Sequence, residues 1–560
     1  MKGKFPVLLL AIIVLAACLR LTALSKNPAS LNWDEVSHGY NAYSILKTGK
    51  DEWGQLLPLT NFRAYGDYPL PLNLYITIPF ISLLGLSEFS IRLPHAILGV
   101  LTVIATYYLA LGITKKKKLS LLVSLLAAIG PWYLFTSRFV LQSNLSVFLL
   151  ISAMAVFFHR KKKRFLLPLS IFLLGLSLFS YHTTRIVSPI LLLLMFGIYR
   201  DEIVKVIKKD KLVAAAMIFF VVLFFVPLPF ILSNPEARAR SQQVFLVNEA
   251  AVNKIVEARQ SSELPAIATK LIYNRPSYFV YEFSKNYLNY FSPDFLFFKG
   301  GTQYQFSIPG KGLLYIVNLP FFYLGLLYIF RKALKGKKKY KLILAWLLIA
   351  PIPASITLEK FAVLRSTPML PLPELLTAIG FFAVLKRLKR FKSYIWVAYL
   401  IALVALLGSY LTTYYNSYRT DYSWAWQYGY KEVVYYAKDH YDEYDKIIVS
   451  KKYGEPHEFF LFFWSWDPEQ YRNDPNLVRF YQSSWYWVDA FDKLYFVNDW
   501  EIPSKGTTFV LESKKEVDCS DANCLFITSP GNYPDGWDKL DTIKFLDDKP
   551  AFEIYEKTIK

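Results

Sequence analysis

The sequence predicts an all-α polytopic membrane domain at residues 1–413, followed by an α/β extracytoplasmic domain at residues 414–560. Apolar runs of about 20 residues, the length that spans a bilayer as a helix, recur through the first part of a chain that is 54% hydrophobic. Short basic clusters separate these runs. After residue 414 no such run remains, and charges of both signs are mixed throughout.

The runs predict about eleven transmembrane helices, which cover most of the larger domain. The predicted spans are residues 5–24, 94–113, 119–136, 141–159, 165–182, 185–199, 212–232, 313–330, 342–358, 367–385 and 393–413.

The net charge of +21 does not point to a nucleic-acid partner, because the basic residues lie in the connections between apolar runs. This distribution is typical of cytoplasmic loops under the positive-inside rule. The clusters are Lys2 with Lys4, and residues 115–118, 160–164, 200–211, 331–341 and 386–392. We therefore expect a multi-pass protein of the cytoplasmic membrane, with its N-terminus inside and its C-terminal domain outside.

The first outer loop, residues 25–93, is expected to hold two helices that lie along the membrane surface. Apolar residues after Asp34 recur on one side of a helix that ends at Thr48 and Gly49. Residues 70–86 are apolar but short for a comfortable span, and prolines precede them. The loop thus places acids and an arginine where water meets lipid.

Two other outer segments carry predictions. Within the long loop 233–311, residues 273–298 read as an amphipathic aromatic stretch, either a lid or a passive interfacial helix. In the C-terminal domain we expect a helix at 426–444. Short strands are expected at 446–451, 459–464, 494–497, 508–511, 525–528 and 552–555.

Side chains of the C-terminal domain leave alternatives open. Its aromatic residues around 464–466 and 485–487 favour core or interface packing over stacking on sugar rings. Cys519 and Cys524 form either a small-loop disulfide or two free thiols.

Three motifs in the first outer loop and its exit resemble a known family. They are Trp33-Asp34-Glu35, then Gly66-Asp67-Tyr68-Pro69-Leu70-Pro71-Leu72, then Ser87-Glu88-Phe89-Ser90-Ile91-Arg92-Leu93-Pro94. Ser137-Arg138 and segments 181–185 and 365–373 extend the likeness. In this order the motifs resemble the GT-C glycosyltransferases of the protein O-mannosyltransferase and lipid A aminoarabinose transferase group, over roughly residues 1–410.

The resemblance implies an enzyme that moves a sugar, with inversion, from a polyprenyl-phosphate carrier to an acceptor hydroxyl on protein, lipid or glycan. It implies that Asp34 is the catalytic base and that Asp67 is a second acid of the site. Glu35 is expected to position Asp34 or to bind substrate. Relatives have Lys or His where this chain has Tyr68, so phosphate binding at that position differs here.

The leaving phosphate calls for cations, and four arginines lie near span ends on the predicted outer side. With Tyr68 and His182, the candidates for binding substrate or phosphate are Arg63, Arg138, Arg185 and Arg365. Structural alternatives stay open: Asp34 as a helix N-cap, Asp67 paired with Arg63, and the arginines reaching lipid headgroups.

Metal binding has little support in the sequence. No metal motif is recognised and no cofactor is certain, although a divalent cation held by Asp34, Asp67 and His182 stays open. Both His38 and His182 lack metal-ligand spacing, which favours packing or hydrogen bonding. Glu374, an acid inside a predicted span, is either functional or paired with a neighbouring helix.

Two other classes of function compete with the enzyme. A polyprenyl-lipid or solute transporter would place ionisable groups near the middle of the membrane and show two related halves. Here the charged candidates lie in outer loops, and no internal repeat is visible. A non-catalytic scaffold for cell-surface assembly, acting through the C-terminal domain, is the third class.

The predicted topology can be tested by labelling single engineered cysteines in intact cells. A cysteine at Ser417 should react with a membrane-impermeant maleimide, and one at Lys337 should react only after the membrane is opened. Labelling of the cysteine at position 337 in sealed cells would contradict the predicted orientation.

Overall fold

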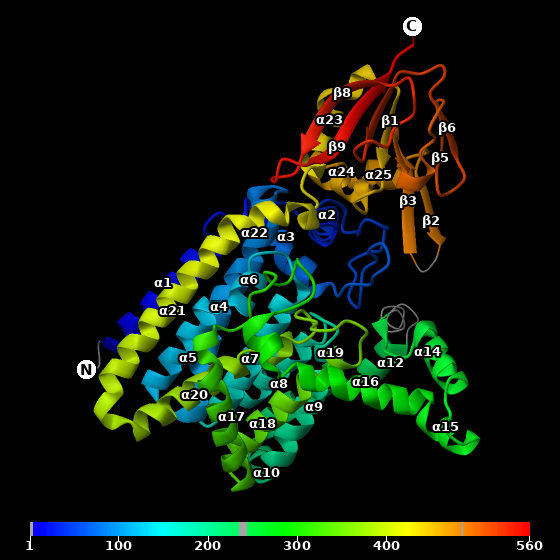
Figure 1. Ribbon diagram of the computed structural model, residues 1–560. Helices are drawn as coiled ribbons and strands as arrows, with labels where there is room; N and C mark the ends of the chain where they lie inside the picture. Colours follow the sequence, from blue (N-terminus) through cyan, green and yellow to red (C-terminus); the bar gives the residue numbers. More distant parts are fainter. Residues whose placement is uncertain (1–3, 234–243, 483–484, 560) are drawn as a thin grey trace. The chain divides into compact units, whose positions relative to one another are not determined.

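The computed structural model describes residues 4–233, 244–482 and 485–559, and the chain divides into two compact units (Figure 1). One unit comprises Met1–Thr22 and His95–Leu411, and the other comprises Ala23–Pro94 and Thr412–Lys560. The boundary near residue 412 lies close to the predicted one. The first outer loop, however, groups with the C-terminal part rather than with the membrane helices. Lys2 and residues 234–243 of the long loop lie outside the described residues.

The membrane unit is helical, and its helices coincide with the eleven predicted spans. Its longest apolar helices include α4 (Glu88–Thr114), α7 (Gln142–His159), α20 (Leu372–Arg387) and α21 (Lys392–Tyr415). The remaining spans correspond to α1 (Lys4–Leu21), α5 (Lys117–Ile129) with α6 (Pro131–Thr136), α8 (Leu166–Ser177), α9 (Thr184–Ile198), α11 (Lys211–Phe225) with α12 (Leu228–Ser233), α17 (Leu319–Leu334), and α18 (Lys338–Ile349) with α19 (Ile352–Ser355).

Length and apolar composition qualify six helical stretches of the described residues as membrane-crossing, and four further apolar helices are shorter. The shorter group contains α8 and α9, and also α3 (Leu72–Leu84) of the first outer loop. The protein is therefore a multi-pass membrane protein. At 13 residues, α3 extends about 20 Å, less than the roughly 30 Å of a hydrocarbon core.

Interrupted helices explain why some predicted spans appear as two elements. A proline begins the second helix in the pair α5 and α6, at Pro131, where Gly130 leaves the helical conformation. Proline lacks a backbone N–H and fits the first turn of a new helix better than the interior of an old one.

Helices outside the spans occupy the basic connections and the long loop. They are α10 (Arg200–Lys209), α14 (Glu249–Gln260), α15 (Ala266–Ile272) and α16 (Arg275–Asn289). The predicted aromatic stretch 273–298 thus contains α16 and a π-helical turn at Asp294–Phe298. Stacked rings of Phe279, Phe283 and Tyr287 follow one another at four-residue spacing along α16.

The second unit combines the outer-loop helices with an α/β domain. The loop forms α2 (Trp33–Thr48) and α3, and the predicted end of α2 is confirmed, since Gly49 takes the left-handed conformation of a helix C-cap at φ 70°. The domain adds α22 (Ser417–Asp421), α23 (Tyr430–Asp439), α24 (Pro456–Trp464) and α25 (Pro468–Asn473).

The domain is built on a seven-stranded sheet in the order β2-β3-β4-β1-β7-β9-β8, visible in orange and red in Figure 1. Its centre is parallel, because β1 pairs in parallel with both β4 and β7, and the remaining pairs are antiparallel. A separate antiparallel pair joins β5 to β6. The strands are β1 (Lys446–Ser450), β2 (Val478–Gln482), β3 (Trp485–Phe491), β4 (Leu494–Val497), β5 (Thr508–Val510), β6 (Glu516–Asp518), β7 (Cys524–Thr528), β8 (Asp538–Lys544) and β9 (Pro550–Lys557).

Two predictions for this domain are wrong. The predicted strand 459–464 lies in α24, whose first turn holds Pro456 and Glu458, residues that suit a helix N-terminus. The predicted helix 426–444 is confined to α23, because Gln427 and Gly429 take positive φ angles that interrupt a helix.

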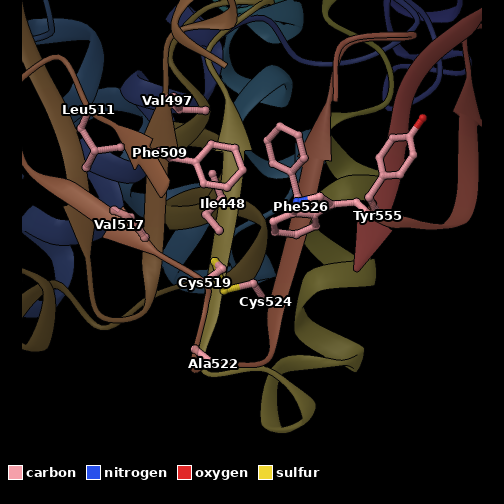
Figure 2. Packing of buried hydrophobic residues seen from close by; sticks show 11 residues of the cluster. Ile448, Val497, Phe509, Leu511, Val517, Cys519, Ala522, Cys524, Phe526 and Tyr555 are labelled. Carbon is pink, nitrogen blue, oxygen red and sulfur yellow. A yellow bond between two sulfur atoms is a disulfide. The ribbon is translucent and has the colours of Figure 1, made fainter. Parts of the chain in front are cut away.

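The domain core lies between the main sheet and the small sheet, and it contains the disulfide that the sequence left open. Cys519 and Cys524 are bonded and buried among Ile448, Phe509 and Phe526 (Figure 2). The bond closes the turn between β6 and β7. It therefore fixes the small sheet to a central strand of the large one.

Replacing both Cys519 and Cys524 by serine should lower the free energy of unfolding of this domain by about 2 kcal/mol, the value expected for a short disulfide loop. The change is measured as a lower melting temperature of the purified protein. Cys18→Ser, which removes the free cysteine, is the matched control and should leave the melting temperature unchanged. An equal melting temperature for the double variant and wild type would contradict the expectation.

Candidate active site in the first outer loop

The start of α2 is fixed by Asn32, which acts as the N-cap. Its side-chain oxygen accepts a hydrogen bond from the backbone N–H of Glu35 at 3.0 Å, and the Glu35 carboxylate accepts one in return from the Asn32 N–H at 3.4 Å. The next backbone N–H, of Trp33, donates to the Gln427 side chain at 2.7 Å. The alternative that Asp34 serves as the N-cap is therefore wrong, and its carboxylate lies exposed in the first turn.

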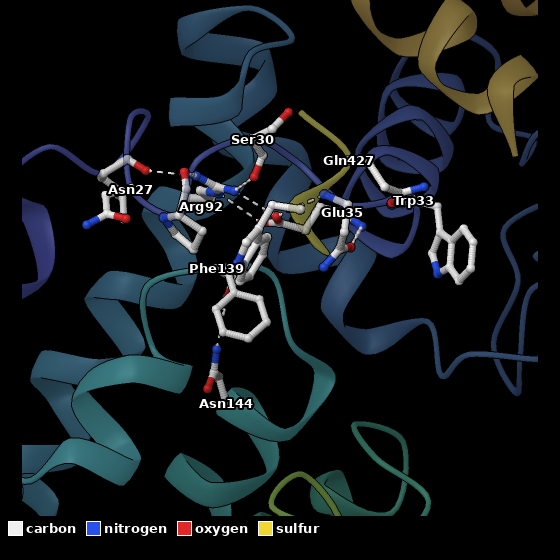
Figure 3. Close-up of polar contacts among 12 residues, drawn as sticks. Asn27, Ser30, Trp33, Glu35, Arg92, Phe139, Asn144 and Gln427 are labelled. Atoms are coloured by element: carbon white, nitrogen blue, oxygen red, sulfur yellow. Dashed lines mark hydrogen bonds and ion pairs between the residues drawn. The ribbon is translucent and has the colours of Figure 1, made fainter. Parts of the chain in front are cut away.

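Glu35 forms a buried ion pair with Arg92 (Figure 3). The two side chains are 0% exposed, and the guanidinium holds both carboxylate oxygens, at 2.9 and 2.8 Å. Its remaining N–H groups donate to the backbone carbonyls of Leu24, Pro28 and Ser30 at 3.1, 3.2 and 2.5 Å. All five donors of the guanidinium are used, so Arg92 ties the chain before α2 to the first turn of α2.

A tight turn brings a tyrosine to Asp34. Ala64 and Asp67 exchange backbone hydrogen bonds of 3.1 and 2.9 Å, which places Tyr65 on the turn. The Tyr65 hydroxyl donates to the Asp34 carboxylate, and its ring stacks on Trp485 with centroids 5.2 Å apart. Burial and the charge of Asp34 raise the pKa of Tyr65 well above its ordinary value, so the phenol remains a donor.

Gly66 permits the close approach between this turn and β3. A Cβ atom at Gly66 would lie 1.9 Å from the Trp485 ring, far inside van der Waals contact. The backbone of β3 adds a hydrogen bond of 3.1 Å from the Tyr486 N–H to the Tyr65 carbonyl. The C-terminal domain therefore shapes the turn that touches Asp34.

Three further predicted residues lie on or beside the same turn. Asp67 is half-buried and accepts the backbone N–H of Tyr68 at 2.8 Å. The Tyr68 and Tyr486 hydroxyls are 3.0 Å apart, and the Arg63 guanidinium lies over the Tyr486 ring, 4.3 Å from its centroid. Trp485 and Tyr486 thus pack at an interface within this unit, as the aromatic pattern predicted.

The remaining predicted residues belong to the membrane unit and have intramolecular contacts there. Arg138 is buried and donates to the carbonyls of Leu19 and Thr22 at the carboxyl end of α1, where a cation opposes the negative end of the helix dipole. Arg185 donates to the Leu178 carbonyl at 3.1 Å, and Arg365 pairs with Glu359. His182 is half-buried, with its ring edge-on to its neighbour Tyr181. Phosphate binding by these residues stays a prediction.

His38 and Glu374 are two further residues that the sequence analysis considered. His38 contacts the Thr77 hydroxyl at 3.0 Å, and burial lowers its pKa to about 3, so it is a neutral packing residue between α2 and α3. Glu374 is buried in the first turn of α20, where the helix dipole favours an acid.

Sequence reasoning missed the roles of Tyr65 and Arg92, although both lie in or beside the motifs. Arg92 could have been identified as an isolated cation at the start of a long apolar helix, a position that demands a buried partner. Tyr65 carried no comparable signal, because its role depends on the turn that brings it to Asp34.

Comparison with known proteins agrees with the predicted resemblance. A family model described as dolichyl-phosphate-mannose-protein mannosyltransferase matches residues 67–228. No curated protein sequence matches the chain.

Two solved structures establish the fold. ArnT from Cupriavidus metallidurans in the apo state has a TM-score of 0.52 at 10% sequence identity, covering 99% of this chain and 98% of that one. The oligosaccharyltransferase AglB from Archaeoglobus fulgidus, in complex with an inhibitory peptide and a dolichol-phosphate, has a TM-score of 0.50 at 14% identity, covering 82% of this chain. The match spans 64% of the AglB chain, less than two thirds of its length. The chain has the GT-C fold, with a helical membrane part and a C-terminal domain.

The buried pair predicts a large cost for Glu35→Gln. Removing one partner leaves the Arg92 charge uncompensated, and the free energy of unfolding should fall by about 3 to 5 kcal/mol. Asp294→Asn is the control, because Asp294 forms an exposed pair with Lys299 and should lose no more than about 1 kcal/mol. Thermal unfolding of the purified variants provides the comparison. Similar small losses for both would contradict the role assigned to the buried pair.

Proposed function

We propose that the protein is an inverting glycosyltransferase that takes a sugar from a polyprenyl-phosphate carrier and transfers it to an acceptor hydroxyl. The observation that carries the proposal is the contrast between two neighbouring acids. The Asp34 side chain is exposed, whereas Glu35 is buried in an ion pair with Arg92. Asp34 is therefore the base, and Glu35 positions it.

The chemistry divides between a base and a cationic site. Asp34 accepts the proton of the acceptor hydroxyl as that oxygen attacks the anomeric carbon, a general-base step. The bond to the carrier phosphate breaks, and the phosphate leaves with its negative charge, which cations stabilise. Arg63 is the predicted cation that lies in the same unit as Asp34, held over aromatic rings.

Several observations support a lipid-linked donor. The matched family model is named for a dolichyl-phosphate sugar, and AglB, which shares the fold, was solved with a dolichol-phosphate. The predicted outer position of the Asp34 loop favours transfer at the outer face of the cytoplasmic membrane. The acceptor hydroxyl belongs to a protein, a lipid or a surface glycan, and the sugar is a hexose or a pentose.

The base assignment predicts that Asp34→Asn lowers kcat/KM by at least about 100-fold, the lower range for removal of a general base. Folding should be preserved, because the side chain is exposed and an asparagine oxygen still accepts the Tyr65 hydroxyl. The assay measures sugar transfer from a polyprenyl-phosphate sugar, together with the melting temperature of the variant.

Asp535→Asn is the matched control, an exposed aspartate of the C-terminal domain that should leave turnover unchanged. Wild-type turnover by Asp34→Asn would remove the base assignment and favour the transporter or scaffold classes. The donor itself is identified by offering purified protein a panel of polyprenyl-phosphate sugars and searching for the glycosylated product by mass spectrometry.

A further inference from the structure

A second cluster of ionisable side chains lies in the same unit, apart from the residues assigned to sugar transfer. Glu52 follows α2 in the first outer loop, and His457 and Glu458 lie in the first turn of α24. One potential ligand atom from each residue lies within 4.8 Å of those of the other two. The side chains are buried, with 1%, 2% and 1% of their surface exposed, so water does not solvate these charges.

Each of the three side chains retains a polar atom without a hydrogen-bond partner among the residues that the structure describes. These atoms are Oε2 of Glu52, Nδ1 of His457 and Oε2 of Glu458. The other Glu52 oxygen accepts the Tyr471 hydroxyl at 3.3 Å. Buried polar atoms without partners are rare in folded proteins, because each costs its lost hydration. Three such atoms in one cluster point to a binding site for a ligand.

The charges of these side chains indicate which kind of ligand would bind here. Burial raises the pKa of both Glu52 and Glu458. The charge of Glu52 raises the pKa of Glu458 further, while a hydrogen bond between the two carboxyl groups lowers the pKa of Glu52. Arg479 lowers the pKa of Glu52, and Glu455, whose own pKa is raised to about 7, raises that of Glu458. Burial lowers the pKa of His457, which keeps its imidazole neutral and able to ligate. Either a shared proton or a cation would relieve the repulsion between the glutamates.

Two cations, Lys451 and Arg479, lie near the cluster, and Arg479 offsets part of the charge of Glu52. Lys451 forms a buried ion pair with Asp489, while Arg479 lies over the rings of Trp53 and Tyr471. A shared proton would satisfy the two carboxyl groups but would leave His457 Nδ1 without a donor, with the Glu455 carboxylate 3.5 Å away. A cation would compensate both glutamates and take one imidazole nitrogen of His457 as a third ligand.

We propose that Glu52, His457 and Glu458 bind a divalent transition-metal cation, with Zn²⁺ as the preferred ion. One imidazole nitrogen and two carboxylate oxygens are ligands that zinc accepts, at about 2.0 to 2.2 Å. In a tetrahedral site the ligand atoms would be about 3.4 Å apart. The three atoms here lie within 4.8 Å of one another, so the side chains would move closer together on binding. This set uses none of Asp34, Asp67 and His182, the ligands considered from sequence.

The cation would join two segments that are distant in the chain. Glu52 belongs to the outer loop that carries Asp34, and α24 belongs to the C-terminal domain. At Gly39, α2 already approaches the Phe462 ring of α24 closely. The metal therefore has a structural role, holding the loop after α2 against α24, and it does not depend on the proposed transfer reaction.

The test begins with the full-length wild-type protein, purified through a tag that binds no metal. Elemental mass spectrometry should find about one zinc per chain. Removal with EDTA should lower the melting temperature, and added ZnCl₂ should restore it, because an ion that binds the folded state stabilises it. If zinc, manganese and iron are absent and neither EDTA nor ZnCl₂ changes the melting temperature, the proposal is overturned and the glutamates share a proton.

Variants then locate the ion. Glu458→Gln and His457→Asn should each lower zinc content by at least about 10-fold, while Glu553→Gln, a buried glutamate elsewhere in the domain, should retain it. Full zinc content in the folded ligand variants would refute the assignment. If these variants do not fold, Co²⁺ exchanged into the wild-type protein decides: visible absorption bands typical of mixed nitrogen and oxygen ligation support the site, and their absence overturns it.

Discussion

The pairing of Glu35 with Arg92 is the interaction on which the geometry of the proposed active site depends. Two opposite charges removed from water cost more than they return unless their hydrogen bonds are complete. Here the guanidinium has no unused donor, since both carboxylate oxygens and three backbone carbonyls accept from it. The pair therefore fixes a geometry more than it contributes net stability.

That geometry decides which of the two neighbouring carboxylates is exposed. Successive residues of a helix point about 100° apart, so anchoring Glu35 inward turns Asp34 toward the exposed side. The capping interaction of Asn32 prevents the first turn from fraying, and the Trp33 N–H is held by Gln427. An acid with a catalytic role gains from such preorganisation, because no energy is spent on orienting it when the acceptor binds.

The sequence predicted those parts of the fold that depend on residues close together in the chain. Apolar runs long enough to cross a bilayer located the membrane helices, and short apolar runs with β-branched or aromatic residues located β1 and β7 closely. The predicted strand at 459–464 was wrong because a short, continuously apolar run fits either a buried strand or a buried helix. Pro456 and Ser465, which begin and end the helix, were the signals that decide between the two.

The candidate site was predictable in part, for the same reason. Asp34 and Asp67 were proposed from motifs whose order follows the chain. The contact of Tyr65 with Asp34 spans 31 residues of the chain. The stacking of Trp485 on Tyr65 and the cluster of Glu52 with His457 and Glu458 join segments more than 400 residues apart. A single sequence records no such pairing, because neither periodicity nor spacing relates residues at that distance.

These long-range contacts also change how the C-terminal domain is understood. Grouped with the first outer loop, it supplies the ring beneath Tyr65, the partner of Tyr68 and the aromatic face on which Arg63 lies. A loop of this length would otherwise pay a large entropic cost to keep Asp34 and Asp67 in fixed positions. The domain lowers that cost by packing against both sides of the turn at Gly66, so it forms part of the scaffold of the proposed active site.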